Sequence, residues 1–201
     1  MPRRSTTSPE EAAALRAAGA RLVRHAHDMV LDLPAAGAAE ARFPDGLAVR
    51  AGVEPSPSLT RAVLAAYPPG HPDVGPAGRR YEEADRELAE LLAGRSAGPV
   101  LRDPSATAAD ASGAVAGTVI VTRIGPEPWG WPGGAWVAIV AVVPAWQGRG
   151  LGRALLERAI VRGAAAGEAH IGLTVTEGNP AERLYRALGF ERWRTLYVLE
   201  A

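Results

Sequence analysis

The spacing of apolar residues near the start of the chain changes from a helical period to a strand period. The sequence SPEE at residues 8–11 predicts a helix start, with Ser8 as N-cap, proline at the first helical position and Glu11 completing a capping box. Residues 21–33 then alternate with a period of about two, which predicts a strand with one apolar face. Residues 1–7 show neither period, and we expect them to be disordered.

That strand candidate carries two histidines, His25 and His27, on the same predicted face, with Asp28 beside them. Two histidines on one strand face are one way to begin a metal site. A third ligand at a usual spacing is missing from the sequence, so partly exposed histidines are the favoured interpretation, and we predict no metal site.

The remaining periodic segments predict an α/β protein with a mixed, largely antiparallel sheet. The expected order is α, β, β, α, α, β, β, β, α, β, α, β, without an internal repeat. The predicted later elements are strands at 47–51, 98–103, 114–124, 135–143, 171–177 and 192–200, and helices at 57–67, 79–94, 151–163 and 180–188. Residues 34–46 have the composition of a linker.

Composition then excludes several chemistries. The chain of 201 residues contains no cysteine, which rules out disulfides, thiolate metal sites and an acyl-cysteine intermediate. All of its 22 basic side chains are arginine, so a lysine Schiff base and a P-loop lysine are impossible. Basic and acidic residues balance at 22 each, which gives no reason to expect nucleic acid or an anionic membrane as a partner.

The sequence contains neither a membrane-spanning apolar run nor a secretory signal pattern. No apolar stretch reaches the length of about 18 to 20 residues that a membrane helix needs. The first 19 residues lack the hydrophobic segment of a signal peptide. We therefore expect a cytoplasmic protein.

A glycine-spaced turn, PAWQGRGLGR at residues 144–153, connects the predicted strand 135–143 to the helix 151–163. Its glycines do not match the dinucleotide fingerprint, because Arg153 stands where a third glycine or alanine is required. Backbone N–H groups at such a helix start are unpaired and favour an anion. The turn is thus either a pyrophosphate site or a connection that binds nothing.

A second motif, GNPAERLYRALGF at residues 178–190, reads as a well-formed helix. Asn179 is the expected N-cap, with proline at the first helical position and Glu182 closing a capping box. Tyr185 falls on its apolar stripe. Taken alone, the motif predicts a helix and nothing more, and a tyrosine in the position of Tyr185 is more often a core aromatic residue than a catalytic one.

Together, VAVVPAWQGRGLGRALL and GNPAERLYRALGF resemble the GNAT superfamily of acetyl-CoA-dependent N-acyltransferases. The resemblance covers residues 46–201 and is strongest from about 135 to 191. It implies a twisted, mixed sheet with flanking helices and a splayed central strand pair. It also implies an N-acetyltransferase domain at 46–201 that follows an N-terminal extension at 1–45.

The resemblance implies a site for acetyl-CoA as co-substrate, with no metal. The backbone of the strand before the turn would pair with the pantetheine amides, and one N–H of Ala141 or Val142 would polarise the thioester carbonyl. The turn would hold the pyrophosphate, and Asn179 would be a further contact. The expected cofactor-binding residues are Val140, Ala141, Val142, Gln147, Gly148, Arg149, Gly150, Leu151, Gly152, Arg153 and Asn179.

The resemblance further implies that Tyr185 protonates the departing thiolate. A general base must take the proton of the amine, yet the strand AWVAIVAVV carries no ionisable side chain. The base is therefore a water or a residue of another element, with Glu177, His71 and Asp73 as candidates. Trp129 and Trp131 either line an acceptor pocket through cation–π contact or pack on the sheet.

The expected function is direct transfer of an acetyl group from acetyl-CoA to an amine, in a ternary complex. Two alternatives stay open: a GNAT module that binds acyl-CoA without turnover, and an acyltransferase with another acyl group or acceptor. The amine is a small molecule or a peptide that the sequence does not identify. A homodimer formed through the N-terminal extension is also left open.

Overall fold

The computed structural model describes residues 3–33, 41–75, 77–127 and 130–200. The chain consists of two compact units. The first unit comprises Met1–Leu31 and Gly172–Ala201, and the second comprises Asp32–Ile171. The described residues of these units form eight strands, in mostly antiparallel pairs, with flanking helices. The expected α/β class is confirmed. The expected splayed pair would involve strands of different units and stays a prediction, as does the boundary at residue 45.

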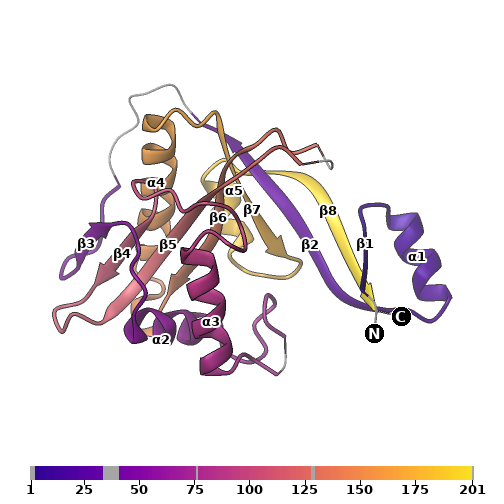
Figure 1. Cartoon of the computed structure of the whole chain (residues 1–201), viewed down its shortest axis with the longest axis horizontal. Helices are drawn as coiled ribbons and strands as arrows, with labels where there is room; N and C mark the ends of the chain where they lie inside the picture. Colours follow the sequence, from indigo (N-terminus) through magenta and orange to yellow (C-terminus); the bar gives the residue numbers. More distant parts are fainter. Residues whose placement is uncertain (1–2, 34–40, 76, 128–129, 201) are drawn as a thin grey trace. The chain divides into compact units, whose positions relative to one another are not determined.

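The first unit is built on long strands from the two ends of the chain. β8 (Glu191–Glu200) lies between β1 (Arg3–Thr6) and β2 (Arg21–Asp32) and pairs antiparallel with both, as Figure 1 shows. β7 (His170–Thr176) is the next strand beyond β2. The expectation of disorder at residues 1–7 is therefore wrong for residues 3–6, because β8 supplies a pairing edge that no local pattern reveals.

α1 (Pro9–Ala17) begins as the sequence predicts. The Ser8 side chain accepts a hydrogen bond from the Glu11 backbone N–H at 3.0 Å, and Pro9 occupies the first turn. The Glu11 carboxylate instead accepts hydrogen bonds from Arg4 and Thr6 on β1. The cap is confirmed, while the reciprocal half of the expected capping box is replaced by contacts to β1.

β2 is a strand as expected, but its faces do not alternate cleanly. The pairing with β8 shifts register between Leu22 and Arg24 and again between Asp28 and Met29. Four consecutive residues, Ala26 to Met29, are buried. Ala26, His27 and Asp28 pair with β8 in continuous register, so both faces of β2 are buried there, and the irregularity after Asp28 turns the following side chains to the other face. The prediction of one continuous apolar face is therefore wrong.

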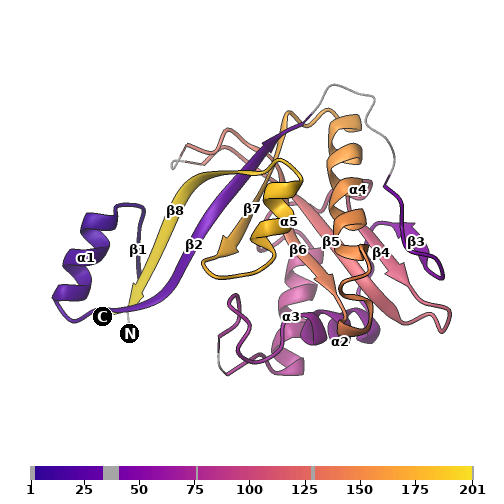
Figure 2. The same cartoon turned by 180° about the vertical axis from the view of Figure 1, so that it is seen from behind.

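The second unit is an antiparallel sheet with helices on both faces. Its strands lie in the order β6 (Gly134–Val142), β5 (Val115–Ile124), β4 (Ala106–Ala109) and β3 (Ala48–Ala51). Figures 1 and 2 show α4 (Leu151–Ala165) on one face, and α2 (Pro57–Ala66) and α3 (Tyr81–Leu92) on the other. The strand predicted at 98–103 is wrong: Val100 makes only an isolated bridge to Thr122, and β4 was missed because ATAA has weak strand propensity.

Buried apolar side chains fix both helix layers on β5 and β6. Leu59 and Val63 of α2 and Leu88 and Leu91 of α3 share a core cluster with Ile120 and Ala141 of the sheet. On the other face, Gly117 brings α4 close, because a Cβ there would lie 3.0 Å from a Leu151 methyl carbon. The start of α4 is therefore held firmly beside the end of β6.

Candidate functional site

The glycine turn follows β6 directly. A short 3₁₀ helix, η1 (Pro144–Trp146), leads into it, and α4 begins at Leu151. Gly148 and Gly150 have φ values of 71° and 85°, a conformation that strongly favours glycine. No other atom lies within 4 Å of a Cβ built at either residue. Both glycines are thus required by the backbone conformation, and open space lies beside them.

This open space adjoins the N-terminus of a long helix. Gly150 is the N-cap of α4, and its carbonyl accepts the first helical hydrogen bond, from Ala154 N–H at 3.0 Å. The preceding N–H groups of the first turn have no partner within the helix, and glycine provides no capping side chain. The helix dipole adds partial positive charge at this end, so the turn favours an anion.

The polar side chains of the turn are held by their neighbours. Gln147 donates from Nε2 to the Val142 carbonyl at 3.0 Å, which ties the turn back to β6. The Arg149 guanidinium carbon lies 5.2 Å from the centre of the Trp146 ring, and Arg153 pairs with Glu157 at 2.9 Å. Leu151 is fully buried and offers only its backbone. Two exposed arginines therefore border the turn.

The register of β6 decides which of its backbone groups face away from β5. Val142 lies opposite Gly117, and Val143 N–H donates to the Ala116 carbonyl at 2.9 Å. Val142 and Val140 are therefore in non-hydrogen-bonded pairs and direct their backbone groups away from β5, whereas Ala141 exchanges hydrogen bonds with Thr118. Of the three expected backbone contacts, Val140 and Val142 are oriented outward and Ala141 is not.

A tyrosine that the sequence analysis missed occupies this outward edge. The Tyr67 hydroxyl donates to the Val140 carbonyl at 2.8 Å. Burial, and next the negative charge of Asp73, raise the pKa of Tyr67 to about 12, so the phenol stays protonated and acts as a donor. In sequence, Tyr67 reads as the C-terminal end of a helix before two prolines, and no local signal shows its contact with Val140.

Two of the candidate bases lie next to Tyr67. The His71 ring packs edge-on against the Tyr67 ring at 4.9 Å. His71 Nδ1 accepts a hydrogen bond from the Asp73 backbone N–H at 3.2 Å and lies 3.7 Å from an Asp73 carboxylate oxygen. The structure thus brings both together with a tyrosine bound to β6, all within the second unit.

Tyr185 lies in the first unit, on α5 (Glu182–Ala187). Its side chain is buried and its ring contacts the Phe190 ring edge-on at 6.1 Å. The helix is shorter than the predicted 180–188, because Arg183 and Leu184 donate to Pro180 and Ala181 in tighter, three-residue turns. Burial of Tyr185 fits both a packed aromatic residue and a phenol placed in an apolar surrounding.

Asn179 is buried just before α5. Its side-chain oxygen accepts from the Ala181 N–H at 2.9 Å, and its own N–H donates to the Thr176 carbonyl at 3.0 Å. The side chain therefore closes the turn before α5, whose N-cap is Ala181 without a side-chain cap. The prediction of Asn179 as the helix N-cap is wrong, because the residues after it form three-residue turns before the α-helix begins. The expected reciprocal bond from Glu182 is wrong, because Thr176 already accepts the Asn179 N–H.

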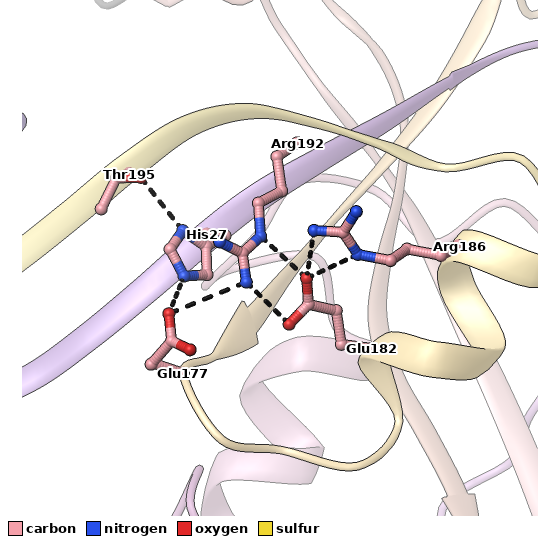
Figure 3. Close-up of polar contacts among 6 residues, drawn as sticks. All are labelled: His27, Glu177, Glu182, Arg186, Arg192 and Thr195. Carbon is pink, nitrogen blue, oxygen red and sulfur yellow. Dashed lines mark hydrogen bonds and ion pairs between the residues drawn. The ribbon is translucent and has the colours of Figure 1, made fainter.

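Glu182 instead joins an ion network, drawn in Figure 3. Its carboxylate accepts two hydrogen bonds from Arg192, at 2.8 and 2.9 Å, and one from Arg186 at 2.9 Å. The hydrogen bond from Arg192 is the main reason that the pKa of Glu182 is lowered to about 2. This network ties α5 to the start of β8.

Glu177, the remaining candidate base, is bound from two sides (Figure 3). His27 Nε2 forms a short hydrogen bond with one carboxylate oxygen, and Arg192 lies 3.7 Å from the same oxygen. The hydrogen bond with His27 is the largest cause of the lowered pKa of Glu177. The pairing of His27 with Glu177 joins positions 150 residues apart, which no spacing rule reveals.

Only one of the two tryptophans considered in the 125–133 connection lies within the described residues. Trp131 is buried and packs edge-on against the rings of Trp136 and His170, at 5.1 and 5.0 Å. This supports packing on the sheet for Trp131. Trp129 lies outside the described residues, so the expectation for it stays a prediction.

The fold and the turn define a class: an α/β protein in which a glycine turn after β6 leads to a helix N-terminus that favours an anion. A family profile described as "Acetyltransferase (GNAT) domain" matches residues 104–192, which include this turn and the Tyr185 helix. Over these residues the chain is similar to the acetyltransferase (GNAT) domain family.

Two solved structures share the fold. A GCN5-related N-acetyltransferase from Sphaerobacter thermophilus matches 98% of this chain with a TM-score of 0.71 and 21% identity. A tandem GNAT protein from the clavulanic acid biosynthesis pathway matches 96% with a TM-score of 0.60 and 20% identity. The chain spans 58% of each of these longer chains.

A sequence relative is similar over a shorter stretch. Mycothiol acetyltransferase of Thermobifida fusca (strain YX) is 47% identical over 60 residues, which are 29% of this chain and 19% of that protein.

Among the residues that the structure describes, no helix combines the length and the apolar character needed to cross a membrane.

Proposed function

We propose that the chain is an N-acetyltransferase that transfers an acetyl group from acetyl-CoA directly to an amine. The observation that supports this most strongly is the turn at Gly148 and Gly150, where open space meets the unpaired N–H groups of α4. The similarity of residues 104–192 to an acetyltransferase domain makes the pyrophosphate of acetyl-CoA the fitting anion. The backbone N–H groups of Gly148 to Arg153 would hold it, with Arg149 and Arg153 nearby.

The β6 register sharpens the expected thioester contact. Because Ala141 uses its N–H in the ladder with β5, the outward N–H of Val142 is the better donor to the thioester carbonyl. Such a donor would stabilise the oxyanion that forms when the amine attacks, an effect of roughly 3 kcal/mol in known enzymes. Val140 would pair with the pantetheine through the same edge of β6.

In the proposed reaction, the amine nitrogen forms a bond to the acetyl carbon and the carbon–sulfur bond breaks. The amine loses one proton to a base, and the departing CoA thiolate gains one from the Tyr185 hydroxyl. Glu177 and Asp73 are the two carboxylates that we propose as alternative proton acceptors. Asp73 is supported by its place beside Tyr67 and β6, and Glu177 by its exposed side chain at the end of β7.

The proposal is tested by following thiol release from acetyl-CoA with a panel of small amines and peptides. We expect release to rise above the amine-free rate with at least one acceptor. If CoA binds in a calorimeter but no amine supports release, the chain is a binding module instead. Glu177→Gln and Asp73→Asn distinguish the bases, because only loss of the true base should remove the acidic limb of the pH profile of kcat/KM.

A further inference from the structure

We propose that His25, His27 and Glu177 form a binding site for a divalent transition-metal ion of the Zn²⁺ type. One ligand atom from each residue lies within 4.8 Å of the others. Two imidazoles and one carboxylate are a ligand set that Zn²⁺ uses in proteins, and imidazole ligands do not suit Mg²⁺ or Ca²⁺. The inference concerns the first unit alone and does not depend on the proposed acetyl transfer.

The backbone places these three side chains together. His25 and His27 are two residues apart on β2, so their side chains leave the strand on the same face. The Glu177 N–H donates to the His25 carbonyl at 2.8 Å, which fixes the end of β7 beside β2. The ring centres of His25 and His27 are 5.0 Å apart. Small side-chain rotations would therefore bring all three ligand atoms to bonding distance.

Neighbours on β8 orient both imidazoles. Thr195 lies opposite His27, and its hydroxyl is 3.0 Å from His27 Nδ1, which leaves Nε2 facing Glu177. Tyr197 lies opposite His25, and the two rings stack at 4.7 Å. Metal-binding histidines commonly have their second ring nitrogen fixed by such a hydrogen bond, which sets the ring orientation. Figure 3 shows His27 held between Thr195 and Glu177.

The surrounding charges leave the Glu177 carboxylate accessible to a cation. Arg192 is the nearby positive charge, but it binds Glu182 through two hydrogen bonds, at 2.8 and 2.9 Å, and is 3.7 Å from Glu177. The Glu177 side chain is 46% exposed, whereas that of His27 is 3% exposed. The site therefore combines a rigid, buried ligand with an open side through which an ion can enter.

A histidine–glutamate hydrogen bond accounts for His27 and Glu177, and stacking on Tyr197 accounts for the ring of His25 but not for its nitrogen atoms. The metal site uses all three residues, so a variant of His25 distinguishes the metal site from a hydrogen bond alone. His25→Phe keeps an aromatic ring to stack on Tyr197 and removes both ring nitrogens. Glu177→Gln keeps the size of an exposed side chain and weakens its metal binding.

The experiment is a calorimetric titration of tag-free, chelator-treated protein with ZnCl₂, and separately with MgCl₂. We expect one Zn²⁺ per chain and no binding of Mg²⁺. His25→Phe and Glu177→Gln should each lower the Zn²⁺ affinity at least about tenfold, and Thr195→Val should weaken it about tenfold while leaving one ion per chain. His71→Gln, which removes a histidine of the other unit, should leave the affinity unchanged.

A titration with Co²⁺ reports on the ligands directly, through the visible absorption of the bound ion. Wild-type protein should develop the bands of a low-coordinate Co²⁺ site, and His25→Phe should not. Circular dichroism checks that the variants are folded, and the exposed position of Glu177 makes Glu177→Gln the variant least sensitive to folding. Absence of Zn²⁺ binding at millimolar concentration, or wild-type affinity in both ligand variants, would overturn the proposal.

Discussion

The glycine turn of the second unit and the polar network of the first unit use the chain in opposite ways. The turn relies on backbone: two positive-φ glycines, the N–H groups of α4 and the outward groups of β6. The network relies on side chains from distant parts of the sequence, among them His27, Glu177 and Arg192. Backbone sites are recognisable from local sequence, whereas side-chain networks depend on the pairing of strands.

This contrast makes the two regions separable by mutation. Changes in the turn should affect how acetyl-CoA is held, and changes around α5 should affect the chemical step or the stability of the first unit.

Tyr185→Phe should lower kcat by about a hundredfold, because a general acid typically contributes that much or more. The CoA dissociation constant should stay within about twofold, since the ring keeps its packing against Phe190. Stopped-flow thiol release and calorimetry measure the two quantities. Tyr81→Phe, an exposed position on α3, is the matched control and should change neither. An unchanged kcat would remove Tyr185 as the acid.

Gly150→Ala should weaken CoA binding by about tenfold, because a side chain disfavours φ of 85° and shifts the N–H groups of the turn. Gly167→Ala is the control: its φ is 82°, no atom crowds it, and it lies beyond the other end of α4. Both variants should lose a similar free energy of unfolding, about 1 kcal/mol. Equal CoA affinity in the two variants would argue against a pyrophosphate at the turn.

Glu182→Gln should lower the free energy of unfolding at pH 7 by about 1 to 2 kcal/mol, because it weakens the hydrogen bonds to Arg192 and Arg186. The pKa of Glu182 is lowered from 4.5 to about 2, so its ionic stabilisation is present above pH 4.5 and is lost as the pH falls towards 2. Urea unfolding from pH 7 to 2.5 should show the two proteins converging. A constant difference would contradict this origin.

Tyr67→Phe should lower the free energy of unfolding by about 1 kcal/mol, since the Val140 carbonyl loses its hydroxyl donor. The exposed Tyr81→Phe variant should differ from wild type by less than about 0.5 kcal/mol. The raised pKa of Tyr67, about 12, also predicts that its ultraviolet titration begins later than that of an exposed tyrosine. A normal titration would show that the hydroxyl is open to solvent.

Most helices and strands were predictable from the sequence, because the regular spacing of apolar residues and the cap residues lie within or directly beside each element. The N-cap Ser8 and the helix start after Gly150 are of this kind. β1 and β4 were missed since their pairing partners, rather than their own residues, define them. The irregularities of β2 likewise arise from its pairing with β8.

In the candidate site, too, only the features that short sequence motifs carry were predictable. The positive-φ glycines and the turn that Asn179 closes before α5 follow from short motifs. The contact of Tyr67 with Val140 spans 73 positions and the pairing of His27 with Glu177 spans 150. Such contacts require the folded arrangement of strands, so a single sequence carries no local signal for them.

Transfer of an acetyl group from acetyl-CoA to an amine nitrogen is tested directly by mass spectrometry. The protein is incubated with an amine panel and with acetyl-CoA labelled with ¹³C in the acetyl group. We expect an acetylated amine that carries the label, formed with an equal amount of free CoA and much more slowly by Tyr185→Phe. Tight CoA binding without labelled product from any amine would contradict it.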